Sequence, residues 1–379
     1  MKRFLAMVLA AWMVCATALG ETSDVDEEVR KIFKMYKAVG GTVLAAKDGE
    51  IIYQYNYGFA NRQSKAPVTE NTYFRVASVT KMVSAIRIMQ LVEAGALDLD
   101  ADLSDYLGFT LRNPYAREVP ITLRHLMTHT SSLNQNGSYG RRGLEALLAL
   151  EGNHRANYYD EVPGTKYRYS NFGAGVMGSV LEAVTGKNVQ DTVAEGVFEP
   201  LGIDAAYHAS YLATPSDIAT CYNSDGTVES SVQKSLTRDW EAEPNPDTHY
   251  NLTVGKLWIT GRDLCRLGIA LCDGGEVDGM VLLQPETVAE MLATQQGRGG
   301  VRIDSPYGLC VNRNDTLLAD RLVYGHQGMS GGITANVYFE PESRFVFVMI
   351  SNGCSNKLQN RVCAISRKLF NLMWEAFGA

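Results

Sequence analysis

The chain has 379 residues, of which 46% are hydrophobic and 20% are charged. This composition is typical of a globular protein with a large core, and the length favours two subdomains. The formal net charge is −7. Because a negatively charged chain is repelled by a phosphate backbone, nucleic acid is excluded as an expected partner.

The first 20 residues have the pattern of a secretory signal peptide. Lys2 and Arg3 precede the apolar run 4–19, and small residues before and at Gly20 provide a cleavage site. The run is shorter than a comfortable membrane-spanning helix. We therefore expect cleavage near Gly20, secretion or a periplasmic location, a mature net charge of −9 and no stable membrane span.

Six cysteines remain after that cleavage, and all of them lie between residues 221 and 363. An even number in an exported protein permits three disulfides but does not require any. Buried thiols that pack as small apolar side chains are at least as good an interpretation.

The first element after the leader is a predicted β-hairpin. Two β-branched and apolar runs, 42–45 and 51–53, flank the dipeptide Asp48-Gly49. Asp-Gly between two such runs is a strong signal for a two-residue hairpin turn.

A candidate nucleophile follows, where an extended run ends at Ser78 and a helical pattern covers 79–92. The few polar residues of this pattern fall on one narrow stripe, which predicts a buried helix. Lys81 lies one turn after Ser78 and off that stripe. Burial and the positive end of the helix dipole both favour the neutral amine, so Lys81 is a candidate base for Ser78. A second Ser-x-x-Lys, at Ser231 and Lys234, lies in a polar stretch and is interpreted as accidental.

The middle of the chain is predicted to be mainly helical. His125 and His129 have the spacing of two zinc ligands on a helix, but Leu126 stands where a metalloprotease has its glutamate. We therefore expect neither a metal nor a cofactor, and we interpret these histidines as capping and core residues.

A second motif, Tyr169-Ser170-Asn171, precedes a predicted helix over 174–185. A phenol can pass a proton when lysine holds its charge, and an amide can hold a lysine together with a substrate carbonyl group. The alternative is that Asn171 caps the helix and Tyr169 only packs. The polar segment 214–250 that follows later is long for a connection, and we expect it to form a rim or lid that influences substrate choice.

The C-terminal part alternates in polarity and predicts antiparallel strands over 307–312, 333–339 and 345–350, followed by a helix over 358–377. Strands at both ends of the chain with helices between them predict an α/β (α+β) fold. In this fold an antiparallel sheet is flanked by helices and interrupted by a helical domain. The expected sheet domain comprises 21–80 and 205–379, and the helical domain comprises 81–204.

A third motif, His326-Gln327-Gly328, lies where glycines crowd the start of a strand, which permits close approach of a ligand. A substrate lying along this edge would have its oxyanion bound by the backbone amides of Met329 and Ser78. Residues 328–332 also match the nucleophile elbow Gly-x-Ser-x-Gly. That motif needs a following helix and a later histidine, and no histidine follows His326.

The ordered set Ser-x-x-Lys, Tyr-x-Asn and His-x-Gly resembles the penicillin-recognising serine hydrolases. These include class C β-lactamases, DD-carboxypeptidases, D-aminopeptidases and related esterases, and the resemblance covers nearly the whole mature chain. It implies a β-lactamase/transpeptidase-like fold, acylation of Ser78, and proton transfer by Lys81 and Tyr169. It also implies that Asn171 orients the lysine and the substrate amide, and that His326, Gln327 and Gly328 line the strand edge.

One position departs from this family pattern. Many members have threonine or serine where this chain has Gln327, and that hydroxyl helps to hold a substrate carboxylate. The expected reaction is hydrolysis through an acyl-enzyme on Ser78, with cell-wall-type D-amino-acid peptides as the leading substrates, as in a DD-carboxypeptidase. The alternatives are a carboxylesterase acting on small esters, a class C-type β-lactamase, and an inactive penicillin-binding or sensing protein.

Overall fold

The computed structural model describes residues 24–135, 142–152, 154–239, 241–296, 300, 302–355 and 357–378. The expected signal peptide lies outside these residues. Within them, every helix is too short or too polar to cross a membrane.

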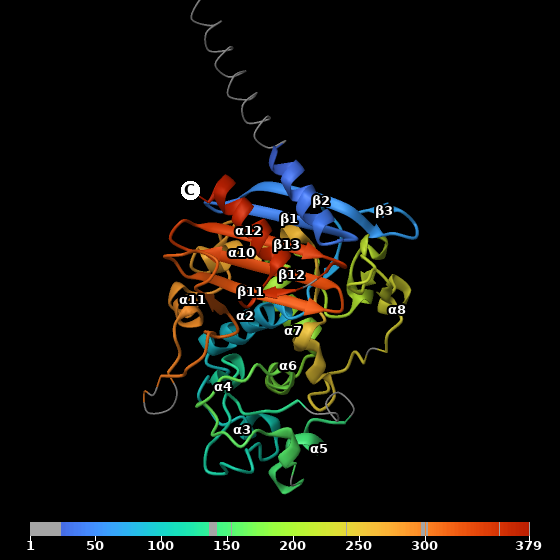
Figure 1. Cartoon of the computed structure of the whole chain (residues 1–379). Helices are drawn as coiled ribbons and strands as arrows, with labels where there is room; N and C mark the ends of the chain where they lie inside the picture. Colours follow the sequence, from blue (N-terminus) through green and yellow to red (C-terminus); the bar gives the residue numbers. More distant parts are fainter. Residues whose placement is uncertain are drawn as a thin grey trace, which may run out of the picture.

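A seven-stranded sheet forms the centre of the upper part of the molecule (Figure 1). All of its strand pairs are antiparallel, in the order β10-β11-β12-β13-β1-β2-β3. Its strands come from both ends of the described chain: β1 (Gly40–Lys47), β2 (Glu50–Asn61), β3 (Ala66–Pro67), β10 (Asn312–Asn314), β11 (Val323–Ser330), β12 (Ile333–Glu340) and β13 (Phe345–Ser351). The expectation of one antiparallel sheet built from distant segments is confirmed.

The first hairpin has the predicted turn. Asp48 and Gly49 have φ angles of 52° and 85°, the left-handed conformation that a tight two-residue turn requires at both positions. β1 pairs with β2 on one side and with β13 on the other. Strands from the N-terminal and the C-terminal parts of the chain are therefore hydrogen-bonded to each other.

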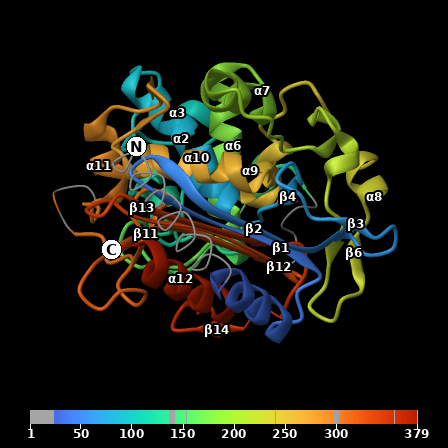
Figure 2. The ribbon, with the colours of Figure 1, turned by 90° about the horizontal axis from the view of Figure 1, so that it is seen from above.

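Helices cover both faces of this sheet (Figure 2). On one face lie α12 (Ala364–Phe377) and the helical residues 24–35, and Phe370 of α12 makes edge contacts with Phe345 and Phe347. On the other face lies α10 (Gly261–Cys272). There Gly268 lets the helix approach β12 and β13, since a β-carbon at this position would lie 2.8 Å from the side chain of Val346.

Helix α2 (Val79–Glu93) joins the sheet to the mainly helical region below it (Figure 1). Eleven of its residues are buried, including Lys81, which confirms the expectation of a buried helix. The remaining α-helices of the described chain are α3 (Ser104–Leu107), α4 (Leu123–Met127), α5 (Glu145–Leu148), α6 (Asn171–Thr185), α7 (Val189–Val193), α8 (Val232–Leu236), α9 (Leu252–Gly255) and α11 (Pro285–Leu292). Two-stranded ladders are formed by β4 (Phe74–Arg75) with β7 (Trp258–Ile259), β5 (Cys221–Tyr222) with β6 (Val228–Ser230), β8 (Glu276–Val277) with β9 (Met280–Val281), and β14 (Leu358–Gln359) with β15 (Val362–Cys363).

One continuous hydrophobic core extends from the sheet into the helical region. It includes Leu44 of β1 and Met177 of α6 in the same cluster of buried side chains. The division of the chain at residues 80 and 204 therefore stays a prediction.

Two predicted elements are wrong in part. Residues 307–311 do not form a strand, because Cys310 has a φ angle of 57° and turns the chain; the strand β10 begins only at Asn312. The last helix begins at Ala364, since Asn360 and Arg361 have φ angles of 48° and 67° and form the turn between β14 and β15. The six described cysteines are all buried and unbridged, as the packing interpretation expects.

Candidate active site

Ser78 lies at the N-terminal cap position of α2, beneath the edge of the sheet. The preceding Ala77 has a φ angle of 45°, a conformation that costs energy for a residue with a β-carbon. β11 comes very close at this point. A β-carbon on Gly328 would be 2.9 Å from the Ser78 nitrogen and would overlap the carbonyl oxygen of Val76. Glycine at position 328 therefore allows the strand to lie directly against the start of the helix.

Lys81 is fully buried, and its Nζ lies 3.0 Å from the Oγ of Ser78. The same amine donates a 2.6 Å hydrogen bond to the carbonyl oxygen of Val254, at the end of α9. Burial disfavours the charged amine and lowers the pKa of Lys81 to about 7. A large fraction of the molecules near neutral pH therefore has a free lone pair on Nζ, beside the serine hydroxyl.

Tyr169 reaches the same point from the loop before α6. Although 40% of its surface is exposed, its hydroxyl lies close enough to the Ser78 side chain to interact with it, and its ring centroid lies 5.4 Å from the Nζ of Lys81. Burial raises the pKa of Tyr169 well above its usual range, so the phenol stays protonated at neutral pH. Ser78, Lys81 and Tyr169 thus converge as the sequence predicts.

Asn171 is the first residue of α6, and the structure excludes it as the helix cap. Ser170 is the cap, and its side chain accepts a 2.9 Å hydrogen bond from the nitrogen of Gly173. The Oδ1 of Asn171 is buried and has no hydrogen-bond partner among the described residues. A buried acceptor without a partner is available to a substrate N–H group.

His326 and Gln327 point to opposite faces of β11, as successive strand residues do. His326 is buried, and burial together with the nearby Lys81 charge lowers its pKa to about 3. The side chain of Gln327 is turned away, because its amide donates to the carbonyl oxygen of Arg361 and accepts from the nitrogen of Cys363. The Gln327 side chain therefore points away from the open edge, contrary to the expectation that Gln327 lines it, and neither Gln327 nor the neutral His326 presents a cation to a carboxylate at this end of the edge.

The edge of β11 is open beside Ser78. β10 pairs with this strand only as far as Gly325, so no described strand lies beside 326–330 on that side. A two-residue turn at Gly331-Gly332 makes Ser330 and Ile333 the closing pair of the hairpin with β12. By alternation, the amide of Met329 then faces away from β12 and toward the open edge. It shares that edge with the Ser78 amide at the N-terminus of α2, which is the arrangement an oxyanion hole requires.

Sequence reasoning missed the aromatic wall behind these groups. The ring of His129 lies 4.3 Å from that of Tyr169 and 5.0 Å from that of Tyr307, and Tyr307 lies 5.5 Å from His326. Burial lowers the pKa of His129 well below its usual range, so this imidazole is neutral. The zinc interpretation gains no support, because no cluster of three potential metal ligands occurs in the described part of the chain. The Val254 carbonyl was missed as well, since a backbone group has no sequence signature.

Two other motifs have structural explanations. Ser231 caps α8 by accepting a hydrogen bond from the nitrogen of Lys234, and the Lys234 side chain is exposed. Residues 328–332 belong to β11 and its turn into β12, so no helix follows Ser330 as a nucleophile elbow requires.

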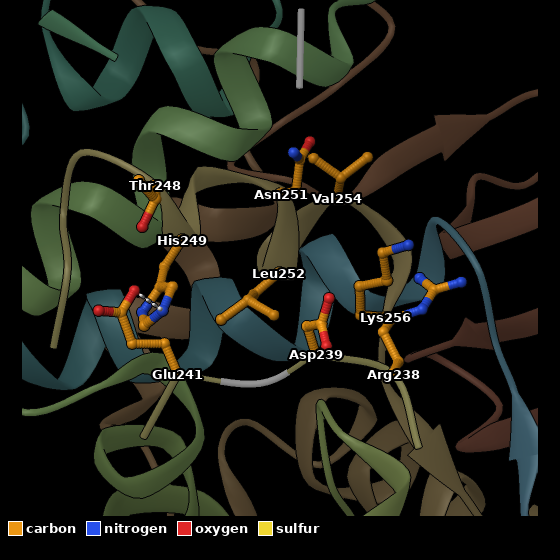
Figure 3. A pocket seen from close by; sticks show the side chains of 9 residues that line it. All are labelled: Arg238, Asp239, Glu241, Thr248, His249, Asn251, Leu252, Val254 and Lys256. Atoms are coloured by element: carbon orange, nitrogen blue, oxygen red, sulfur yellow. Dashed lines mark ion pairs between the residues drawn. The ribbon is translucent and has the colours of Figure 1, made fainter. Parts of the chain in front are cut away.

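A pocket of about 760 Å³ lies beside this site and is drawn in Figure 3. Its lining includes Val254, which holds Lys81, and five residues of the predicted lid segment 214–250: Arg238, Asp239, Glu241, Thr248 and His249. The remaining lining residues are Asn251, Leu252 and Lys256. The lid segment therefore forms much of this pocket wall, as the sequence suggests for a rim.

Glu182 of α6 fixes this wall in place. Its fully buried carboxylate accepts hydrogen bonds from the Nδ1 of His249 at 2.9 Å, the nitrogen of Asn245 at 2.6 Å and the nitrogen of Val189 at 2.9 Å. Two of the three donors belong to the lid segment. A single buried acceptor thus ties the lid to the helix that begins at Asn171.

We expect Glu182→Gln to lower the free energy of unfolding by about 2–3 kcal/mol, because an amide leaves a buried donor unmatched. Urea denaturation measures this change. Glu195→Gln is the control: Glu195 is half exposed and, within the described structure, forms its ion pair with Lys187 on the surface, so a change below about 0.5 kcal/mol is expected. Equal effects of the two substitutions would contradict the role of Glu182 as an anchor.

Comparisons with known proteins identify the family of the chain. The chain matches the family described as Beta-lactamase over residues 25–368. It is similar to "Esterase EstB" of Burkholderia gladioli, with 32% identity over 56% of each chain, and to a "D-aminopeptidase" of Gluconobacter oxydans (strain 621H), with 27% identity over 53% of this chain and 38% of the relative. The chain thus spans about half the length of these relatives, or less.

A solved structure, "A class C beta-lactamase", has the same fold, with a TM-score of 0.72 and 20% identity over 93% of this chain and 96% of that one. The match to the family model covers most of the chain, including all three motifs. The chain therefore belongs to the beta-lactamase family, a family of serine hydrolases.

Proposed function

We propose that the protein hydrolyses acyl compounds through a covalent ester on Ser78, and that small carboxylic esters are its best substrates. The observation that supports this proposal is the 3.0 Å distance between the Lys81 Nζ, whose pKa is lowered by burial, and the Ser78 Oγ, with the Tyr169 hydroxyl close to the same serine. A nucleophile, a base and a proton donor at one point are the components of acyl transfer.

In the proposed reaction, the Oγ of Ser78 attacks the acyl carbonyl carbon, and its proton passes to the Nζ of Lys81. Lys81 is the better first base, because the Tyr169 phenol holds its own proton at neutral pH. The oxyanion is held by the amides of Ser78 and Met329. The bond to the leaving group then breaks, and the leaving group receives a proton through Tyr169. A water molecule repeats these steps in reverse and releases the acid from Ser78.

The proposed ranking of substrate classes differs from the ranking that the sequence motifs alone favour. A DD-carboxypeptidase must receive the terminal carboxylate of its peptide, but the Gln327 amide is bonded elsewhere and His326 is neutral. The identity to an esterase and to a D-aminopeptidase supports esters and D-amino-acid amides, which need no such contact. Cell-wall-type D-peptides therefore become the second candidate, and export of the protein stays a proposal.

A substrate panel tests this order. We expect kcat/KM for a short-chain aryl ester to exceed that for a D-alanyl-D-alanine peptide by about tenfold or more, the value of one missing charged hydrogen bond. A fluorescent penicillin and a fluorophosphonate complete the panel, with Ser78→Ala as the negative control and Ser231→Ala as the matched positive control. Faster cleavage of the peptide would restore the D-peptidase assignment. If no substrate is cleaved and neither covalent probe labels Ser78, the protein is a binding protein.

A further inference from the structure

The proposed proton route gives the substrate a direction in the site. Tyr169 delivers the proton to the leaving group. Its ring packs against His129 and lies near Tyr307, whose ring in turn lies 5.5 Å from that of His326. The leaving group must therefore lie at the His326 end of the open edge of β11. The acyl group then extends the other way, past Met329 and toward Ser330.

Cationic side chains gather at that second end. Arg75 donates a 2.9 Å hydrogen bond to the Oγ of Ser330, and it lines a small recess together with Lys256 and Arg238. Lys256 follows Gly255, whose β-carbon would lie 3.3 Å from the backbone of Ala77, the residue before the nucleophile. In Figure 3, Lys256 and Arg238 lie side by side at one end of the pocket, and Glu241 with His249 lies at the other.

The acidic side chains near this end do not neutralise all three cations. Glu229 forms an ion pair with Arg75, and both of its carboxylate oxygens lie 3.1 Å from the Nη2 of that arginine. Asp239 lines the pocket, but within the described ranges no ion pair joins it to Lys256. Glu241 accepts a hydrogen bond from Asn245 at the far end. Among the described residues, Lys256 thus faces the pocket without an ion pair of its own, and the carboxylate that favours its charge from nearby is Glu229, which is bound to Arg75.

Lys256 is also in an electrostatically unfavourable position when the pocket holds no anion. Partial burial, with the positive charges of Arg238 and Arg75 nearby, lowers the pKa of Lys256 to about 8. A protein rarely places a lysine among like charges at a pocket wall without a compensating partner. A bound carboxylate would supply that partner and would favour the charged amine.

We propose that Lys256, with Arg238 and Arg75 behind it, binds a carboxylate carried on the acyl part of the substrate. This inference rests on the proposed acyl-hydrolase function and narrows its substrate class to monoesters or monoamides of dicarboxylic acids. The anionic group is then recognised on the acyl side, at the lid pocket, and not on the leaving-group side at β11.

Two nitrophenyl esters that differ only in charge test this inference: the monoester of glutaric acid and the ester of its neutral methyl half-ester. The wild type is expected to prefer the anionic ester, measured as the ratio of the two kcat/KM values. Lys256→Gln should lower that ratio by roughly 10- to 100-fold, the usual effect of removing a charge partner from a partly buried site. Lys256→Arg should keep most of it.

Lys234→Gln is the matched control, because it removes the same charge from an exposed position on α8 outside the pocket lining. It should keep the wild-type ratio. If Lys256→Gln does not fold, Arg238→Gln tests the same cluster from an exposed residue. An unchanged ratio in either pocket variant, or no preference in the wild type, overturns this inference while the ester hydrolase proposal stands. Failure of the wild type to cleave both esters or to label at Ser78 overturns the proposed function, and this inference with it.

Discussion

Lys81→Ala should lower kcat/KM for the aryl ester by about 10³-fold or more, a loss of at least about 4 kcal/mol of transition-state stabilisation. Removal of the amine deprives Ser78 of its proposed base at 3.0 Å and leaves Tyr169 as the side chain that interacts with the serine hydroxyl. Tyr169 is a poor substitute, because its proton is held too tightly at neutral pH. Initial rates under conditions far below KM measure the effect.

The pH profile separates loss of the base from loss of the fold. With a pKa of about 7, Lys81 is neutral above that pH, so kcat/KM of the wild type should rise as the pH increases through about 7 and then level off. His326 has a pKa of about 3 and stays neutral over this range, so its titration does not change kcat/KM there. In Lys81→Ala the rise of kcat/KM near pH 7 should disappear.

The second Ser-x-x-Lys of the chain provides a matched control. Lys234→Ala changes an exposed lysine three residues after a serine that only caps α8, and its rate and pH profile should equal those of the wild type. Lys81→Met fills the buried volume better than alanine and should lose the same activity with less loss of stability. Retention of more than a tenth of the wild-type rate in Lys81→Met would contradict the assignment of Lys81 as the base.

Gly328→Ala is expected to lower turnover by about 10²- to 10³-fold, the usual effect of losing one oxyanion-hole donor. The added methyl group would overlap the carbonyl oxygen of Val76 and lie 2.9 Å from the Ser78 nitrogen, so β11 must move away from α2. The amide of Met329, the next residue along the strand, would move with it. The rate of Ser78 acylation by a fluorophosphonate measures the change without a need for turnover.

A stability control is needed because any strained substitution destabilises a protein. Gly95→Ala provides it: Gly95 has a φ angle of 70° at the far end of α2, and a β-carbon there would meet no atom within 4 Å. It should cost about 1 kcal/mol in unfolding free energy and leave acylation per folded molecule unchanged. If the two glycine variants lost acylation equally, the oxyanion-hole assignment would be wrong.

Residues with strong local signals were predictable from the sequence. The buried face of α2 and the Asp48-Gly49 turn follow from periodicity and from turn chemistry, and the structure has both. The convergence of Ser78 with Tyr169 was inferred from the order of the motifs, because segments 91 residues apart leave no local trace of their contact.

Other features depend on tertiary contacts that the hydrophobic pattern of the sequence does not indicate. The alternating run 307–312 resembles a strand, but the left-handed conformation of Cys310 and the packing of Tyr307 against His129 determine its path. The amide of Gln327 is engaged by the hairpin β14–β15, in a region where the sequence predicted only helix. Its orientation was therefore beyond sequence reasoning.

The hydrogen bond from Lys81 to the Val254 carbonyl restricts where the chain around the pocket can change in length. The backbone that ends the pocket also holds the proposed base, only two residues before Lys256. Insertions or grafts that remodel the pocket should be tolerated only before Asn245, which Glu182 holds, whereas a shift of one position beyond it would displace the amine beside Ser78. New substrate ranges should thus arise by exchange upstream of this boundary, while the short stretch downstream keeps its length.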